Sequence, residues 1–397
     1  MIMSDYIYFD NAATTLQDLR VTEVMLSCMN ENFGNPSAQY GPGFATRRII
    51  NNARENAASL IGAKADEVIF TSGGTESDNQ ALSYMHYFEK GKNLVVSAVE
   101  HPAILNTCKR LESFGYKVHM VKPDCFGTVH AEEIEKAIDG NTVMVSVMMA
   151  NNEVGTVMPV RSIAETAHRH GCIFHTDAVQ TLGIIPIDVH DLGIDLLSGS
   201  GHKLYGPKGS GLLFVRSGLN VPCLIEGGGQ ENGFRSGTEN VPAITGFGEA
   251  CRIASEELTQ RSKYESELRN HIASRILSEI SDATINGVPI DESYFNEQEL
   301  PKRLPGNLHV SFKGVNGVSL RILLDMKNIC VSTGSACSAS NEKHSHVLDA
   351  MGLPDDITDS SLRITVGKNN TMEETDRFVD ILKESVFNVR RLMGGRN

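Results

Sequence analysis

The sequence predicts an α/β protein, with a large domain on a mostly parallel sheet and a smaller α+β domain after it. Short apolar segments alternate with helical segments over the first half of the chain. A long segment of helical periodicity then runs from about 239 to 280, and further apolar strands and a last helix follow. Strands and helices that alternate at this spacing are typical of a parallel sheet covered on both faces.

The elements of the large domain follow from hydrophobic period and stop signals. Residues 43–61 are predicted to form an amphipathic helix, because apolar side chains such as Ile50, Ala53 and Ala57 share one face and Gly62 ends it. Strands are expected at 67–70, 93–98, 117–121, 142–149, 172–175 and 211–215, with another apolar strand before Lys203. Further helices are expected at 75–89, 102–113, 131–138 and 160–170.

The segment from 239 to 280 lacks a turn cluster after Pro242, so it is expected to be a helical connector into the second domain. That domain is predicted to hold strands at 306–312, 329–332 and 362–366 and a final helix at about 372–393.

Composition excludes several function classes. The net charge is −13, from 36 basic and 49 acidic residues, which argues against direct binding of nucleic acid or of an anionic membrane. We expect no targeting segment and no membrane span, since the chain lacks a long apolar run. The eight cysteines are scattered without a Cys-x-x-Cys pair, which favours a reduced, cytoplasmic protein whose cysteines are mostly buried.

Lys203 stands between the small residues 198–201 and the Gly-Pro-Lys-Gly turn at 206–209. An apolar strand that leads into such a lysine suggests a buried amine able to form a Schiff base, although a lysine near glycines is often a solvated turn residue. Two further features favour the first interpretation: an apolar approach ends at Asp177, and a strand runs through the turn 71–75 into a helix. An aspartate, a Schiff-base lysine and an anion cup are what pyridoxal 5'-phosphate requires.

The run 201–209, Gly-His-Lys-Leu-Tyr-Gly-Pro-Lys-Gly, and the run 331–337, Val-Ser-Thr-Gly-Ser-Ala-Cys, resemble cysteine desulfurases of the NifS/IscS type. The resemblance extends from 8–15 to 361–364. It implies the type I fold of pyridoxal-phosphate-dependent transferases, with a large domain at 15–255 and a small domain at 1–14 and 256–397. The small domain would carry a mobile cysteine loop at about 330–345.

Gly73, Gly74 and Thr75 stand at the start of a predicted helix. Such a helix start suits a phosphate, because backbone N–H groups and the helix dipole point at it. The alternative interpretation of these residues is an ordinary N-cap turn. The resemblance implies a phosphate cup of Gly74, Thr75, Ser200 and His202, completed by Thr238 of the partner subunit in a homodimer. Asp177 would pair with the pyridine nitrogen, and Gln180 and Asn152 would bind the phenolic oxygen.

His101 follows a predicted strand, and its ring is suited to stacking on the cofactor and to proton transfer. Arg363 offers a planar fork for the substrate α-carboxylate, a role that the resemblance implies, with Asn152 also at the substrate. Cys337 lies in a run of small polar residues, so we expect an exposed, reactive thiol on a mobile loop. Cys330 is expected to be buried and inert.

The resemblance implies conversion of L-cysteine to L-alanine: Lys203, helped by His101, moves the α-proton, and the Cys337 thiolate takes the substrate sulfur as a persulfide. The sulfur would pass to an iron–sulfur scaffold or a tRNA-thiolation relay. A selenocysteine lyase and a catalytically silent scaffold protein remain alternatives. The chain departs from the family pattern at Leu16, Tyr40 and Asn232. The histidine pairs 168/170 and 344/346 lack the cysteines or carboxylates at the spacing that a metal site would need, so they are expected to be solvated.

Overall fold

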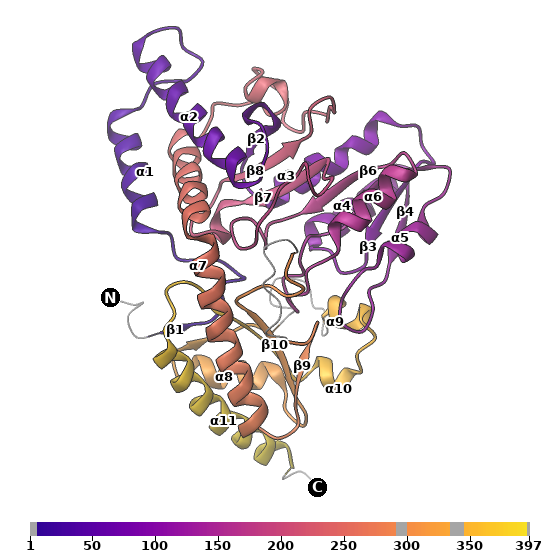
Figure 1. The fold of residues 1–397 in the computed structure, drawn as a ribbon, viewed down its shortest axis with the longest axis vertical. Helices are drawn as coiled ribbons and strands as arrows, with labels where there is room; N and C mark the ends of the chain where they lie inside the picture. The colour runs from indigo at the N-terminus through magenta and orange to yellow at the C-terminus, as the bar shows by residue number, and fades with distance from the viewer. Residues whose placement is uncertain (1–5, 291–299, 334–344, 395–397) are drawn as a thin grey trace.

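The computed structural model describes residues 6–290, 300–333 and 345–394. A large sheet with its helices forms one part of the molecule, and a smaller sheet with its own helices forms the other (Figure 1). One long helix, α7 (Val241–Glu279), runs along both parts. Its residues Phe247 and Cys251 belong to the core beside the large sheet, whereas Leu268 and Ile272 belong to the core of the smaller part.

The large sheet has seven strands in the order β2-β8-β7-β6-β5-β3-β4. All neighbouring pairs are parallel except those of β8, which runs antiparallel to both β2 and β7. The prediction of a mostly parallel sheet is therefore confirmed. The bounds are β2 Val68–Thr71, β3 Asn93–Ser97, β4 Lys117–Val121, β5 Thr142–Ser146, β6 Ile173–Asp177, β7 Leu196–Ser200 and β8 Gly211–Val215.

Helices and apolar side chains cover both faces of this sheet. Successive strand residues point to opposite faces, so Phe70 and Val95 lie in one core and Ile69, Leu94 and Val96 in the other. The helices of this part are α1 Leu19–Glu31, α2 Gly41–Leu60, α3 Gly74–Leu82, α4 Pro102–Ser113, α5 Ala131–Ala137 and α6 Val160–Arg169.

The smaller part contains an antiparallel sheet in the order β12-β10-β9 and a parallel pair of β1 with β11. Its core includes Phe9, Phe312 and Phe378, and the rings of Phe9 and Phe378 meet edge to face at 5.1 Å. The N-terminal strand thus completes this part from the far end of the chain. The bounds are β1 Ile7–Tyr8, β9 Ala283–Asn286, β10 Asn307–Phe312, β11 Ile329–Cys330, β12 Ser361–Thr365, α8 Gly317–Asp325, α9 His346–Ala350, α10 Asp355–Thr358 and α11 Met372–Gly394.

Some predicted bounds were wrong. The helix predicted at 75–89 ends at Leu82 and continues as a 3-10 turn, Ser83–Tyr87, and the strand predicted at 142–149 ends at Ser146. The domain boundary predicted after residue 255 falls inside α7, which passes through it unbroken, and it stays a prediction. Among the described residues, no helix has the length and apolar character needed to cross a bilayer.

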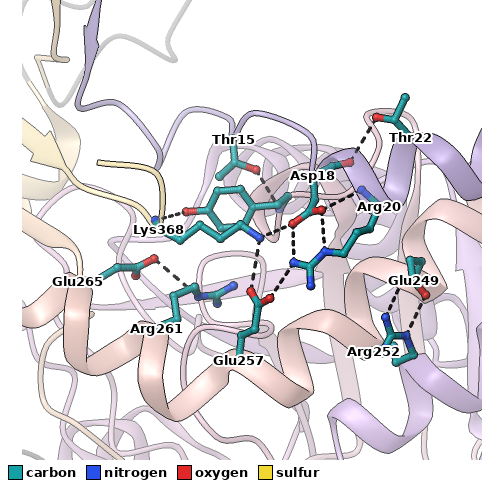
Figure 2. Close-up of polar contacts among 11 residues, drawn as sticks. Thr15, Asp18, Arg20, Thr22, Glu249, Arg252, Glu257, Arg261, Glu265 and Lys368 are labelled. Carbon is teal, nitrogen blue, oxygen red and sulfur yellow. Dashed lines mark hydrogen bonds and ion pairs between the residues drawn. The ribbon is translucent and has the colours of Figure 1, made fainter. Parts of the chain in front are cut away.

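A charged network joins three segments that are distant in the sequence (Figure 2). Lys368, after β12, pairs with Asp18 at 2.5 Å and with Glu257 of α7 at 3.5 Å. Arg20 of α1 pairs with the same two carboxylates, at 2.8 and 2.7 Å. Arg20 and Lys368 together hold the pKa of Asp18 well below its usual range. The network therefore holds the N-terminal segment, α7 and the smaller part together.

Candidate active site

The predicted site residues meet at one edge of the large sheet, where its parallel strands end. Strand β6 ends at Asp177, and β7 ends at Ser200 and continues as a 3-10 turn, Gly201–Lys203. Strand β3 leads to His101, the N-cap of α4, and β2 leads to Gly73, the N-cap of α3. Ligands of parallel α/β sheets bind at this edge.

Lys203 is held by the N-terminal segment. Its Nζ donates to the carbonyl oxygen of Ala12 and, at 2.7 Å, to that of Ala13. Gln180 Nε2 donates to the same Ala12 oxygen at 3.1 Å. Lys203, Gln180 and Ala12 line a cavity of about 40 Å³, which also borders Thr365 at the end of β12. The lysine thus lies where the two parts of the molecule meet.

Asp177 is a buried carboxylate beside this lysine. Its Oδ1 accepts a hydrogen bond from the backbone N–H of Val179 at 2.8 Å. Burial raises the pKa of Asp177 to about 6, against the opposing effects of that hydrogen bond and of the Lys203 charge. A buried carboxylate that ionises near neutrality is suited to pairing with a cationic ring nitrogen.

Three more ionisable side chains lie buried in the same region, and sequence reasoning did not identify them. His175 Nδ1 contacts Ser146 Oγ at 2.8 Å, and its Nε2 lies 3.0 Å from Ser198 Oγ and 3.8 Å from Asp78 Oδ1. Burial lowers the pKa of His175 to about 3, so the ring is neutral.

Burial disfavours the charged form of the two carboxyls in this cluster. Burial and the neighbouring Asp177 raise the pKa of Asp78 well above its ordinary value, and burial raises that of Glu100 to about 8. Glu100 Oε1 accepts hydrogen bonds from Ser97 Oγ and Met148 N, at 2.5 and 2.7 Å. Negative charge is therefore disfavoured on Asp78 and on Glu100. His175, a polar residue inside the apolar segment that forms β6, was the signal that could have revealed this cluster.

His101 is held as a neutral ring. Its Nδ1 accepts the backbone N–H of Ala103 at 3.2 Å, so its proton resides on Nε2. Burial, followed by the charges of Lys203 and His346, lowers the pKa of His101 to about 4. The imidazole is uncharged at neutral pH, as a ring that stacks on a cofactor and donates from Nε2 requires.

The start of α3 fits a phosphate. A methyl group added at Gly74 would lie 2.5 Å from Val179 Cγ2 and 3.8 Å from Ser200 Cβ, so the helix start packs tightly on Val179, just after β6, and also borders the end of β7. Thr75 and His101 border an open cleft of about 430 Å³. N–H groups at the start of a nine-residue helix and the hydroxyls of Thr75 and Ser200 form a donor set for an anion.

His202 and Thr238 are the other two residues of the predicted phosphate cup. His202 Nδ1 lies 3.1 Å from Thr14 Oγ1, and burial, with the charges of Lys203 and Lys208, lowers the pKa of the ring to about 4. Thr238 lies exposed in a segment that an ion pair between Arg235 and Glu76, at 3.0 Å, joins to the first turn of α3. Its contribution to a partner subunit's site stays a prediction.

Arg363 reaches the site from β12 of the smaller part, where it is 1% exposed. Its Nη2 pairs with Asp10 Oδ1 at 2.8 Å, and its Nη1 donates to the carbonyl oxygen of Asn152 at 3.1 Å. Its Nε has no hydrogen-bond partner in the part of the chain that the structure describes. The sequence indicated Arg363 and Asn152 but not Asp10, which occupies part of the guanidinium fork.

Comparison with known proteins places the whole chain in one family. Residues 7–378 match aminotransferase class-V. A cysteine desulfurase IscS of Methanosarcina thermophila is 43% identical over 388 residues, which cover 97% of this chain and 93% of the relative. A solved NifS-like protein superposes with a TM-score of 0.88 at 39% identity, covering 96% of this chain and 100% of its own. SspA, solved in complex with cysteine, gives a TM-score of 0.79 at 36% identity, with 92% and 99% coverage.

The chain belongs to the class-V aminotransferase family. Within that family it is a cysteine desulfurase of the NifS/IscS type, as the runs at 201–209 and 331–337 predicted. The α/β fold with a mostly parallel large sheet agrees with this membership.

In this class-V aminotransferase, Cys337 lies outside the described residues, but the described residues on either side of it contact the site. Ser332 exchanges two backbone hydrogen bonds with Arg363, of 3.1 and 2.7 Å. On the other side, Ser345 Oγ donates to the buried carboxylate of Glu153 at 2.5 Å, and His346 Nε2 lies 3.0 Å from the carbonyl oxygen of Glu100. The chain therefore leaves beside Arg363 and returns beside His101.

Two minor expectations need correction in this desulfurase. His346 is half-buried at the site, whereas His168 and His170 are exposed as expected. Cys330 is only half-buried, although burial still raises the pKa of its thiol. Among the described cysteines, Cys28, Cys108, Cys172 and Cys251 are buried, Cys223 is intermediate and Cys125 is exposed.

Proposed function

We propose that this cysteine desulfurase converts L-cysteine to L-alanine and retains the substrate sulfur on Cys337 as a persulfide. The observation that carries the proposal is the convergence of Lys203, Asp177 and His101 at one sheet edge, with Arg363 beside them. Ser332 and Ser345, which lie on either side of the undescribed segment containing Cys337, contact Arg363 and Glu153.

Pyridoxal 5'-phosphate is the proposed cofactor, and the residues present fit it. The amine of Lys203 would hold its aldehyde, Asp177 its ring nitrogen, His101 its ring face, and Gln180 and Asn152 its phenolic oxygen. The start of α3 at Gly74 and Thr75, with Ser200 and His202, would hold its phosphate. When bound, it supplies an electron sink for the charge left when the substrate loses its α-proton.

The chain's own residues supply binding and proton transfer. Arg363 would bind the substrate α-carboxylate through its fork. Lys203 would take the α-proton and return a proton to the product, with the neutral His101 ring donating from Nε2. The Cys337 thiolate would form a bond to the substrate sulfur while the bond between that sulfur and the substrate Cβ breaks. The persulfide keeps both sulfur atoms, and a proton added at Cβ completes alanine.

We propose a cytoplasmic homodimer in which Thr238 of each subunit completes the phosphate cup of the other. The exposure of Thr238 supports the homodimer, and the absence of paired cysteine motifs supports the cytoplasmic location. Sulfur would pass from Cys337 to an iron–sulfur scaffold or a tRNA-thiolation relay, a proposal supported by relatives that carry the name IscS.

Two variants test the proposal. Lys203→Ala should abolish both alanine formation from L-cysteine and the yellow, borohydride-sensitive colour of the bound cofactor. Cys337→Ala should keep the colour but lose alanine formation and the alkylatable persulfide seen by mass spectrometry. Undiminished alanine formation by Lys203→Ala would overturn the mechanism. A Cys337→Ala protein that loses cysteine activity but still releases alanine from selenocysteine would indicate a selenocysteine lyase, and a colourless wild-type protein a silent scaffold.

A further inference from the structure

The pair formed by Arg363 and Asp10 raises a question about substrate binding. A guanidinium that must accept a carboxylate from the substrate already contacts a carboxylate of its own chain, at 2.8 Å. We propose that Asp10 is a positioning residue: it neutralises and holds Arg363 when the site is empty, and it yields the guanidinium to the substrate α-carboxylate. This inference deepens the proposed function and rests on the proposed role of Arg363.

The two partners differ in exposure. The Arg363 side chain is 1% exposed, whereas that of Asp10 is 20% exposed. A buried charge without a partner is strongly destabilising, so the empty site needs a counter-ion for Arg363. The more exposed carboxylate of Asp10 can be hydrated again when another carboxylate replaces it. The pair is therefore suited to exchange of its anion.

The guanidinium also retains a donor that no described residue uses. Asp10 contacts Nη2 through one oxygen, and Asn152 contacts Nη1 through its carbonyl oxygen. Nε is buried and has no partner among the described residues. Two parallel bonds to one carboxylate are the strongest arrangement for an arginine, and Asp10 does not make them. A substrate carboxylate that engages two donors would replace a weaker contact with a stronger one.

The backbone around Asp10 is fixed, so exchange requires only rotation of its side chain. Asp10 forms a parallel bridge with Thr365, and its carbonyl oxygen accepts hydrogen bonds from Ala13 N at 2.9 Å and Tyr8 Oη at 3.0 Å. The same turn holds Lys203 through the carbonyl oxygens of Ala12 and Ala13. Residues 10–13 thus contact both Lys203 and Arg363.

Competition of this kind lowers the apparent affinity for carboxylates, because only the fraction of molecules with Arg363 released can bind fully. Neutralising Asp10 should therefore strengthen carboxylate binding while it weakens the empty protein. A residue with a purely structural role would weaken the protein without strengthening binding. The opposite signs of these two effects make the test decisive.

The experiment measures the binding of propionate to the cofactor-loaded protein by calorimetry, together with the unfolding temperature without ligand. Propionate carries the carboxylate but lacks an amino group to react with the cofactor. Asp10→Asn should bind propionate about tenfold more tightly than wild type, because the propionate carboxylate then competes with a neutral amide for Arg363. The variant should also unfold at a lower temperature, because a hydrogen bond from Arg363 to a charged carboxylate is worth more than one to an amide. Asp10→Ser should shift both quantities in the same directions, and Asp10→Glu should restore an affinity near wild type.

Asp18→Asn is the matched control, since it removes another carboxylate of the N-terminal segment that pairs with Arg20 and Lys368 instead (Figure 2). It should lower the unfolding temperature and leave propionate affinity unchanged. Arg363→Gln should abolish propionate binding; if it binds as well as wild type, the proposed role of Arg363 fails. If Arg363→Gln abolishes binding but neither neutral Asp10 variant strengthens it, that role stands and the inference about Asp10 is wrong.

Discussion

Buried ionisable side chains in the region of Asp177 determine which charge the site carries. Asp78, Glu100 and Asp177 are all carboxyls buried beneath the site, yet their pKa values are raised to different extents. The neutral His175 ring lies beside Asp78 and gives no positive charge to offset them. A region that excludes water disfavours several ionised carboxylates side by side, so the raised pKa values follow from the burial of the cluster.

Asp177→Asn should reduce desulfuration of L-cysteine by about 10²–10³-fold, as expected for the loss of one preorganised electrostatic contact. Retention of the cofactor during dialysis should fall as well, because the ring nitrogen loses its counter-ion. Asp78→Asn is the matched control in the same cluster: burial disfavours the charged form of its carboxyl, so the change should alter the local charge less than Asp177→Asn does. Equal losses in the two variants would contradict the assignment.

Glu100→Gln tests the protonated state through stability. The pKa of Glu100 rises from 4.5 to about 8 on folding, so the folded state binds an extra proton between these values. The stabilisation from this proton is complete below pH 4.5 and is lost as pH rises through about 8. The variant should therefore gain stability relative to wild type between pH 5 and 8.5, measured by urea unfolding. Glu112→Gln, on the exposed side of α4, is the matched control.

Sequence reasoning could identify Lys203, Asp177 and His101, because each is a reactive residue type at the end of an apolar strand. It could not identify Asp10, which pairs with a residue 353 positions away. Nothing in local spacing indicates such a contact, and only the pairing of the N-terminal segment with β12 brings it about. The predicted loop containing Cys337 falls outside the described residues and stays a prediction.

At the scale of elements, α2 and α7 pack with almost no space between their backbones. A methyl group at Gly248 would lie 2.4 Å from Ala53 Cα, so the glycine is required by the close approach of the two helices. Gly248→Ala should lower the free energy of unfolding by about 1–3 kcal/mol, since overpacking outweighs the helix-propensity gain of alanine. Chemical denaturation measures the change.

Gly41→Ala is its matched control at the start of α2, where a methyl group would meet nothing within 4 Å. It should leave stability unchanged or raise it slightly. A loss of stability in Gly41→Ala as large as that in Gly248→Ala would show that the loss of glycine itself, and not the packing of α2 on α7, is responsible.

The strands and helices of the large sheet could be predicted because their apolar periods are strong. The antiparallel direction of β8 was not predicted, although the ten residues between β7 and β8 are too few for a usual parallel crossover. The first helix, α1, was not predicted, and only Val21 and Cys28 of its thirteen residues are buried. Strand β9 was not predicted either, because it is short and partly exposed.

For the whole molecule, the network around Lys368 should contribute stability that salt can weaken. Lys368 contacts Asp18 and Glu257, and its ammonium lies 4.6 Å from the centre of the Tyr205 ring. Lys368→Met should lower the free energy of unfolding by about 1–2 kcal/mol at low salt, and the difference should shrink in 1 M salt because screening weakens the ion pairs in the wild type.

Lys327→Met is the matched control, since Lys327 pairs only at the surface with Glu384, at 2.7 Å. Its effect should stay below about 0.5 kcal/mol at any salt concentration. A Lys368 variant that behaves like this control in urea unfolding would mean that the network does not hold the two parts of the molecule together.

The pairing of β1 with β11 has a consequence for synthesis on the ribosome. Ile7 is paired in register with Ile329, so the first strand emerges roughly 320 residues before its partner exists. At typical elongation rates of about 5–20 residues per second, that delay lasts roughly 16–64 seconds. The large sheet can assemble during this interval, whereas the turn at residues 10–13 reaches Arg363 only near the end of translation. The protein therefore acquires its catalytic arrangement last, after most of its mass has folded.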